Sequence, residues 1–337
     1  MSLASYREQG WFRLGGLTAI GLAIIGALLS VVFEIDLTRL ITPGFAIRTL
    51  EMATPIALAA VGGLYAEKSG VFNIGLEGFM IIGAFTTAAA MFMLGGTSPS
   101  QPHIWTAIIA TVIVSGVLGL IFAVLLIRFE ADQIVAGLAV WFIGLGFAPF
   151  TAALLWGSQS SPGLASINRL TFSLSPLVLL TVVVVIVAWG VLFRTKYGYW
   201  VQAAGENPGA LDTAGINVNR VRYTTVIFSS MMSGLGGAVL LAHAGNFVGT
   251  GTTMVDGRGW IAIVAYLFGN YNPIGAAGAA LLFGGLDMLN VQFQTVGIEV
   301  SARLVNLLPY VAVLVVLTIY GKTRIPAVVG ESYDTEK

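Results

Sequence analysis

Long runs of apolar residues, about 20 at a time, most restrict how this chain can fold. An α-helix rises about 1.5 Å per residue, so roughly 20 residues cross a hydrocarbon core of about 30 Å. The pattern predicts an all-α, polytopic membrane protein with about ten transmembrane helices, some of them broken or short. The expected spans are 14–33, 45–65, 71–94, 104–127, 134–156, 176–193, 223–245, 260–269, 274–291 and 302–320.

Composition excludes several classes of protein. Only 9% of the 337 residues are charged, whereas soluble domains carry about 25%. The formal net charge is zero, so no basic field attracts nucleic acid, and no nucleic acid partner is expected. With no cysteine and only two histidines, thiolate and His-rich metal sites are excluded as well.

The distribution of basic residues predicts the orientation in the membrane, because Lys and Arg stay on the cytoplasmic side. Arg7 and Arg13 precede the first span, which lacks a signal-peptidase site, so we expect a retained anchor and a cytoplasmic N-terminus. Ten spans then return the C-terminus to the cytoplasm. The expected inside set is Arg7, Arg13, Lys68, Arg128, Arg194, Lys196, Arg220, Arg222, Lys322, Arg324 and Lys337. The smaller outer set is Arg39, Arg48, Arg169, Arg258 and Arg303.

This topology divides the chain into three parts. Residues 1–13 form a cytoplasmic N-terminal segment, 14–321 the transmembrane domain, and 322–337 a cytoplasmic tail. Two glycine-rich segments interrupt the spans, SGVFNIGLEG at 69–78 and GNFVGTGTTMVDGRG at 245–259. In transporters such interruptions often mark the substrate path, since irregular backbone is tolerated only where protein or water covers it.

Acidic residues at membrane depth must face protein or water. For Glu77 two interpretations stand: it binds loop N–H groups and fixes a bend, or it gates the path directly. Asp287 lies about 20 Å along a helix that starts at 274. It pairs with Arg258 or Arg303, or it faces a cavity with the neighbouring amides Asn290 and Gln292; an ion pair is the preferred interpretation.

Other polar residues receive structural interpretations. Arg48 and Glu51 are three residues apart on one helix, so a local ion pair or snorkelling explains them. His103 is expected in an outer loop and His243 near the outer end of a span, both as ordinary hydrogen-bonding residues.

The connection 194–222 contains the signals of a short cytoplasmic helix. Asn207 is expected to cap it, Pro208 suits its first position, and Gly215 provides a left-handed stop. Ala210, Leu211 and Ala214 would form a small apolar stripe. A helix this short is unstable alone, so we expect a partner to hold it; the alternative is a solvated loop with an incidental capped turn.

Three segments resemble a known family: GLYAEKSGVFNIGLEGFMIIGAF (63–85), AAGENPGALDTAGINVNRVR (203–222) and GNYNPIGAAGAALLFGGLD (269–287). They are similar to permease subunits of bacterial ABC importers in the branched-chain amino acid, ribose and nucleoside superfamily, nearest the nucleoside branch. Sugar permeases usually have a more glycine-rich segment at 269–274, which favours nucleoside over ribose.

The resemblance implies a type II-like importer permease in the bacterial inner membrane. It implies two cytosolic ATPase subunits that bind ATP and Mg, a second and different permease chain, and an extracytoplasmic binding lipoprotein, besides membrane lipids. This chain would hold no cofactor or metal and no catalytic residue. The resemblance also assigns coupling to the ATPases to Gly205, Glu206, Asn207, Pro208, Ala210, Leu211, Ala214 and Gly215.

A path for a nucleoside would need aromatic faces and amides. The candidate residues for this path or its gate are Phe72, Asn73, Glu77, Trp141, Asn246, Phe247 and Asn290. For Trp141, packing or interface anchoring is the stronger interpretation.

The alternatives are a permease for simple sugars and an ion-driven secondary transporter. The second would use a relay of charges in mid-membrane, which the sequence does not show. Gly321-Lys322-Thr323 lacks the earlier glycine of a phosphate-binding loop, because Val316 stands there, so this chain is not expected to bind ATP. No HExxH or G-x-S-x-G pattern is present, which argues against an intramembrane enzyme.

Overall fold

The computed structural model describes residues 43–170, 173–251, 253–296 and 325–333. Helices dominate this part, and its only extended pairing is an isolated bridge between Ser160 and Val248. The expected all-α fold is thus confirmed for the described residues. The helices are α3 (Pro43–Lys68), α4 (Leu76–Gly95), α5 (Gln101–Ile127), α6 (Gln133–Trp156), α7 (Pro176–Arg194), α8 (Lys196–Glu206), α9 (Pro208–Thr213), α10 (Val218–Ala244), α11 (Arg258–Phe268) and α12 (Pro273–Val296).

Six of the described helices, α3 to α7 and α10, are long and apolar enough to cross a membrane. Two further apolar stretches, α11 and Pro273–Leu289 within α12, are shorter. The expected spans 14–33 and 302–320 lie outside the described residues. The total of ten spans therefore stays a prediction.

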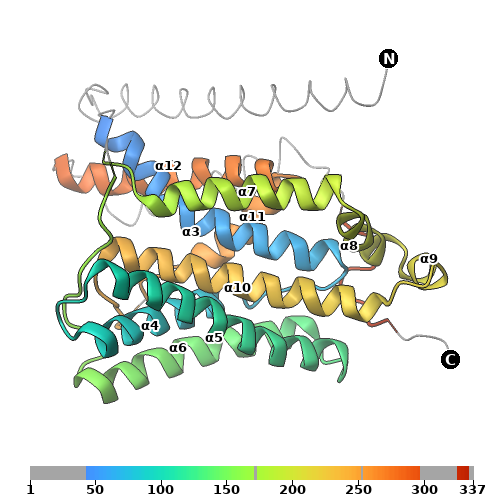
Figure 1. Ribbon diagram of the computed structural model, residues 1–337, viewed down its shortest axis with the longest axis horizontal. Coiled ribbons are helices and arrows are strands. Elements are labelled where there is room, and N and C mark those ends of the chain that lie inside the picture. Colours follow the sequence, from blue (N-terminus) through green and yellow to red (C-terminus); the bar gives the residue numbers. More distant parts are fainter. Residues whose placement is uncertain (1–42, 171–172, 252, 297–324, 334–337) are drawn as a thin grey trace.

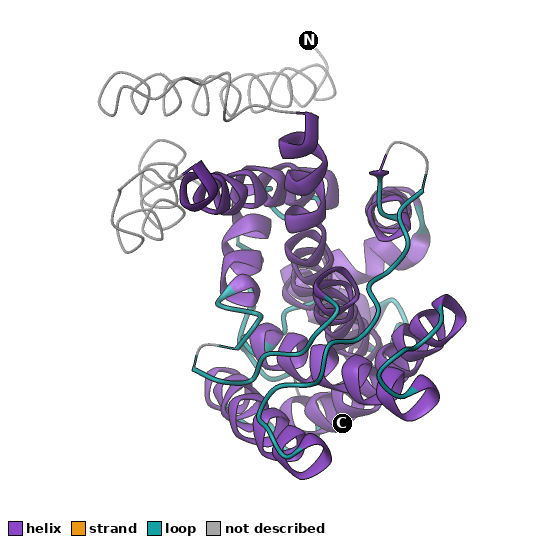
Figure 2. Ribbon diagram, turned by 90° about the vertical axis from the view of Figure 1, so that its left-hand side faces the viewer, coloured by secondary structure: helices purple, strands orange, loops and turns teal. Residues whose placement is uncertain are grey.

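The long helices lie side by side along the length of the molecule (Figures 1 and 2). One end of the bundle, which we call the loop end, holds α8 and α9 and the described C-terminal residues (Figure 1). Helices α3, α5 and α7 finish there, and α6 and α10 begin there. The basic residues Lys68, Arg128 and Arg194 stand at these helix ends, as the expected inside set requires.

Helix α10 is the centre of the bundle and packs against α3, α4 and α5. Glycines allow this close approach: a Cβ atom at Gly83 would lie 2.3 Å from the Gly234 carbonyl oxygen, and one at Gly237 would lie 1.9 Å from that of Met80. About 78% of the most apolar window of α10 is buried. Small residues at helix crossings are the usual means of tight packing in membranes.

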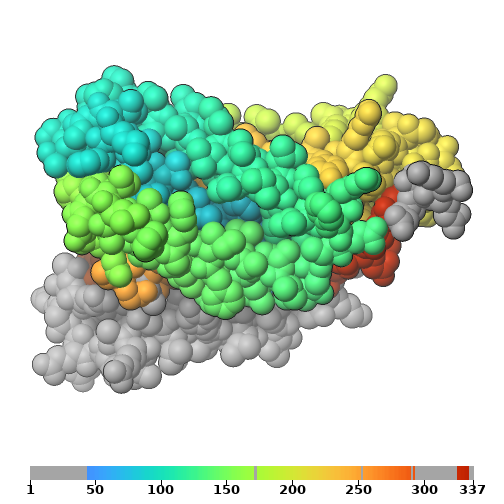
Figure 3. Space-filling view, turned by 90° about the horizontal axis from the view of Figure 1, so that it is seen from below, coloured from blue at the N-terminus to red at the C-terminus, as the bar shows by residue number. Residues whose placement is uncertain are grey.

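Helix α6 lies at the edge of the bundle, and only 17% of its most apolar window is buried. Its exposed side chains include Phe142, Phe147, Phe150 and Leu154. Figure 3 shows the green surface of α5 and α6 covering much of one face. A face this apolar is suited to contact with lipid or with another membrane protein.

Two helix starts and one extra helix differ from the sequence prediction. Helix α4 begins at Leu76 instead of residue 71, because the preceding residues 69–75, which we call the elbow, are not helical. Helix α10 begins at Val218, five residues before the expected 223, since Asn217 caps it by accepting a hydrogen bond from the Arg220 N–H. The connection 194–222 also contains α8, which its moderate hydropathy concealed.

Candidate functional site

The elbow is held by side chains from α6 and α10. The Asn73 side chain is 1% exposed; its Nδ2 donates to Ser229 Oγ at 2.9 Å, and its Oδ1 accepts from the Gly75 N–H at 3.0 Å. The Phe72 N–H donates to Gln133 Oε1 at 2.5 Å. The elbow therefore interrupts the span as expected, and Asn73 uses both ends of its amide within the protein.

Glu77, in the first turn of α4, binds the start of α11. Its Oε1 accepts from the Gly257 N–H at 2.9 Å and its Oε2 from the Gly259 N–H at 2.6 Å. The side chain is only 3% exposed. The first N–H groups of a helix lack partners and carry partial positive charge, so they stabilise a buried carboxylate. The structure thus shows the hydrogen bonds of the first interpretation; a gating role stays a prediction.

The starts of α4 and α11 are in direct contact. A Cβ atom at Gly259 would lie 2.4 Å from the Glu77 nitrogen, so only glycine fits there. Helix α11 is a half-span packed between α3, α4 and α12. The glycine-rich segment before it folds against the loop that follows α6: the Phe247 N–H donates to Ser161 Oγ at 2.8 Å, and the Ser161 N–H donates to the Phe247 carbonyl at 2.9 Å. Protein covers part of this irregular backbone, including Gly245, Phe247 and Gly249, whereas Thr250, Gly251 and Asp256 are exposed.

Asp287 pairs with Arg258 at 3.0 Å between Oδ2 and Nη2, which confirms one of the two expected partners. Both side chains are mostly buried. The other expected partner, Arg303, lies outside the described residues. This ion pair joins the start of α11 to α12.

A third acid, Glu67 near the end of α3, was missed by the sequence reasoning. Its Oε1 accepts a hydrogen bond of 2.6 Å from the Tyr271 hydroxyl, in the turn between α11 and α12. Burial and the nearby Glu67 charge raise the pKa of Tyr271, so its phenol stays neutral and donates. Both ends of α11 are thereby tied to neighbouring helices.

The aromatic candidates for the path take part in packing. Trp141 meets Trp260 edge to face with ring centroids 5.5 Å apart, and Phe247 is fully buried against Phe85 at 5.7 Å. Asn246 is partly buried, and the side chain of Asn290 is not described. Six of the seven candidates have described side chains: Phe72 and Asn73 lie in the elbow, Glu77 and Trp141 contact the start of α11, and Asn246 and Phe247 lie in the glycine-rich segment before it.

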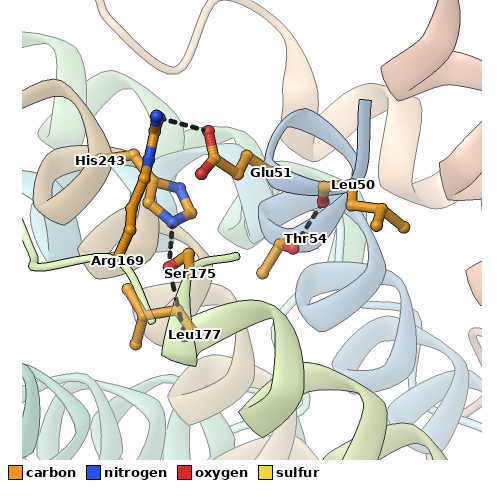
Figure 4. A network of polar contacts seen from close by, with 7 residues as sticks. All are labelled: Leu50, Glu51, Thr54, Arg169, Ser175, Leu177 and His243. Carbon is orange, nitrogen blue, oxygen red and sulfur yellow. Dashed lines mark hydrogen bonds and ion pairs between the residues drawn. The ribbon is translucent and has the colours of Figure 1, made fainter. Parts of the chain in front are cut away.

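At the far end of the bundle, polar side chains form the network of Figure 4. Glu51 Oε2 pairs with Arg169 Nη2 at 3.0 Å, and His243 Nε2 lies 2.8 Å from Ser175 Oγ. Of the two interpretations for Arg48 and Glu51, the local ion pair is not formed, because Glu51 is buried and pairs with Arg169, whereas Arg48 is exposed, as snorkelling would have it. A cavity of about 450 Å³ is lined by Ser166, Ile167, Asn168, Arg169 and His243.

Both histidines have ordinary hydrogen bonds. His103 lies in the first turn of α5, not in a loop, and its Nδ1 accepts from the Ser100 N–H at 3.3 Å. His243 is near the end of α10, as expected. Neither histidine belongs to a metal-binding group, since the described residues contain no cluster of three or more such ligands.

The short loop helix has the predicted local geometry. Helix α9 spans Pro208–Thr213, Asn207 Oδ1 accepts from the Ala210 N–H at 3.0 Å, and Gly215 has φ +81°. Within the predicted stripe, Leu211 is buried against the bundle, whereas Ala210 and Ala214 are exposed. Gly205 and Glu206 belong to the end of α8, so the segment assigned to coupling is a helix end, a cap and a second helix.

The outward face of α9 is small and open. Glu206, Asn207, Ala210, Ala214 and Gly215 are all exposed, and Pro208 is partly so. The only residue of α9 that is buried is Leu211. A helix of this length needs external contacts, and these exposed small side chains allow another protein to approach its backbone closely.

Residues 45–317 match the model of a family described as "branched-chain amino acid transport system / permease component". The chain belongs to this family. It is therefore a transport subunit and not an enzyme, and its apolar helices make it a multi-pass membrane protein.

Curated relatives include transporter subunits for nucleosides. The chain is 35% identical over 309 residues to the guanosine ABC transporter permease protein NupQ of Bacillus subtilis, covering 85% of this chain and 94% of that one. It is 33% identical over 304 residues to the nucleoside ABC transporter permease protein NupC of Lactococcus lactis, covering 85% and 95%. A galactofuranose transporter permease protein of Escherichia coli is 26% identical over 296 residues, covering 85% and 82%. No solved structure matches the chain.

Proposed function

We propose that this chain is the permease subunit of an ATP-driven nucleoside importer in the bacterial inner membrane. The observation that carries the proposal is α9, a capped helix with a small exposed face at the loop end of an apolar bundle. Such a helix fits a cleft in a cytosolic ATPase and transmits its movement. The loop end and both termini would face the cytoplasm, in agreement with the basic residues there.

The permease works in this proposal with other subunits. Two ATPases would bind ATP and Mg, a second and different permease would complete the path, and an external lipoprotein would deliver the substrate. Gly205 to Gly215 would seat in the ATPase, with Ala210 and Ala214 at the contact and Leu211 holding the helix to the bundle. Phe72, Asn73, Glu77, Trp141, Asn246, Phe247 and Asn290 are proposed to come together along the path in another state of the transport cycle.

Nucleosides are preferred over sugars because the two relatives of 33–35% identity are named for guanosine and nucleosides, whereas the relatives named for sugars are 26–27% identical. An ion-driven mechanism lacks support from the acids at depth. Glu77 is bound by main-chain N–H groups, Asp287 by Arg258 and Glu67 by the Tyr271 hydroxyl, so none of the three is an unpartnered proton or sodium carrier.

The test of coupling is a charge on the exposed face of α9. We expect Ala210→Glu to reduce nucleoside uptake by roughly tenfold or more in proteoliposomes that hold the whole complex, because coupling free energies commonly reach this size. If the ATPase still binds the variant, ATP hydrolysis should continue without uptake. If the ATPase no longer binds it, ATP hydrolysis by the complex should fall together with uptake. The matched control is Ala131→Glu, in the partly exposed α5–α6 connection at the same end.

Competition tests the substrate in the same preparation. Unlabelled guanosine or uridine should reduce the uptake of labelled nucleoside, whereas ribose and galactofuranose in equal excess should not. Uptake that sugars block and nucleosides do not would assign the chain to the sugar permeases. Full uptake by Ala210→Glu would refute the role of α9.

A further inference from the structure

The C-terminal residues 325–333, which we call the strap, lie across the junction between α8 and the elbow. The Val328 N–H donates to the Gly205 carbonyl and the Gly330 N–H to the Gly70 carbonyl, each at 3.1 Å. Figure 3 shows the strap in red at the same end of the molecule as the yellow loop helices. The strap thus bridges two segments that lie more than a hundred residues apart in the sequence.

A buried arginine joins the strap to the elbow. Arg222, in the first turns of α10, is 3% exposed, and its Nε donates to the Ser69 carbonyl at 3.1 Å. Its Nη1 donates to the Glu331 carbonyl of the strap at 2.8 Å. A buried guanidinium needs hydrogen-bond acceptors, so the strap provides part of what makes this charge tolerable.

The elbow is shaped to receive both contacts. Gly70 has φ +92°, and a Cβ atom there would lie 2.8 Å from Arg222 Nη2 and 3.3 Å from the Val328 carbonyl oxygen. Beside it, a Cβ atom at Gly205 would lie 2.3 Å from the Lys68 carbonyl oxygen. The end of α8, the elbow and the strap are therefore in backbone contact, with no side chain between them to absorb a displacement.

The far end of the strap reaches α9. The Tyr333 hydroxyl donates to Asp212 Oδ2 at 3.2 Å. This hydrogen bond and the burial of Leu211 are two of the contacts that hold α9 to the rest of the protein. The strap therefore contacts α9 at one point and the elbow at another.

The elbow in turn leads to the interrupted spans. Ser69 Oγ lies 2.7 Å from Thr225 Oγ1, Asn73 binds Ser229, and Glu77 follows directly and holds the start of α11. We propose that the strap is a positioning element of the transport cycle: it transmits displacement of α9 to the elbow, and so to the starts of α4 and α11. This rests on the proposed function, in which α9 receives the movement of the ATPase.

The experiment compares two truncated chains in the complete transporter. One ends at Tyr333 and keeps the strap; the other ends at Ile325 and lacks residues 326–333, which make all the strap contacts described above. In proteoliposomes with equal amounts of assembled complex, the measured quantity is substrate taken up per ATP hydrolysed. We expect the chain ending at Tyr333 to match the full chain, and the chain ending at Ile325 to lose roughly fivefold or more, as for a broken coupling between sites.

If the shorter chain fails to assemble, a single substitution in the full-length chain tests the same contact. Tyr333→Phe removes only the hydroxyl, and we expect it to lower uptake per ATP by about twofold to fivefold, the effect of one lost hydrogen bond. Arg222→Lys, which cannot reach both carbonyls with one flat group, should act in the same direction.

The outcomes separate the strap from the proposed function. The strap inference would be overturned if the chain ending at Ile325 kept the full-chain value of uptake per ATP. If that shortened chain does not assemble, an unchanged ratio in Tyr333→Phe would overturn it instead. If Ala210→Glu still abolished uptake in that case, the role of α9 would stand. If Ala210→Glu also had no effect on uptake, the role of α9 in the proposed function would be refuted, and the strap inference with it. A lower ratio in the strap variants, with the chain ending at Tyr333 unaffected, supports the inference.

Discussion

At the scale of single residues, the bundle uses its acids at depth to join helices. Glu77 caps the start of α11, Asp287 pairs with Arg258, and Glu67 accepts from Tyr271. Each acid binds a partner on or next to α11, the half-span. A short helix inside a membrane protein has unpaired N–H groups at its start, and Glu77 provides their acceptors.

Glu77→Ala should destabilise the protein because it leaves the Gly257 and Gly259 N–H groups buried without an acceptor. We expect a loss of about 3 kcal/mol, and roughly half of this for Glu77→Gln, which keeps one oxygen. Thermal unfolding in detergent measures the change. The control is Glu206→Ala at an exposed site; equal stability of Glu77→Ala and this control would contradict the capping role.

The residue contacts that could be predicted from the sequence are of two kinds. Some are local in the chain, and others involve a residue with only a few possible partners. The Asn207 cap, Pro208 and the Gly215 stop follow from short-range rules, and Arg258 was one of two partners foreseen for Asp287. Arg169 was missed as the partner of Glu51 because 118 residues separate them in sequence. No pattern in one sequence indicates such a contact, since it depends on how the loop before α7 folds over α3.

At the scale of elements, the predicted spans match the observed helices where the length of an apolar run sets the bounds of the helix. Helices α5, α6 and α7 begin and end within a few residues of the expected bounds. The start of α4 was misplaced because Val71, Phe72 and Ile74 are apolar yet belong to the elbow, where tertiary hydrogen bonds fix the backbone. Hydropathy alone does not distinguish an apolar irregular segment from the first turn of a helix.

The glycines of α4 and α10 give a matched test of helix packing. Gly83→Ala places a Cβ atom 2.3 Å from the Gly234 carbonyl oxygen, so the two backbones must separate. We expect a loss of about 1–3 kcal/mol, as for overpacked cores. Gly190→Ala in α7 meets open space, so its stability should stay equal or rise slightly.

Thermal unfolding of the two alanine variants in the same detergent compares them directly. A Gly83→Ala protein as stable as Gly190→Ala would show that α4 and α10 do not pack as closely as described.

At the scale of the whole molecule, the described residues form a bundle of apolar helices with short loop helices at one end. Glu77 is held by main-chain N–H groups, Asp287 by Arg258 and Glu67 by the Tyr271 hydroxyl, and α9 stands exposed at the loop end. The permease family and the multi-pass membrane character could be predicted from the sequence. The family match and the apolar helices confirm these two predictions. The contacts among the candidate path residues could not be predicted, because they depend on how the elbow, α4, α6 and the start of α11 pack together.

The central claim is that partner ATPases, acting on this permease, drive uptake. The most direct measurement is the accumulation of labelled nucleoside in proteoliposomes. One preparation contains the permeases, ATPases and binding protein with ATP inside or outside; the other contains this chain alone with an imposed sodium or proton gradient. The account predicts accumulation only in the first, and only with ATP on the side of α9. Accumulation by the chain alone, driven by either ion gradient, would contradict it.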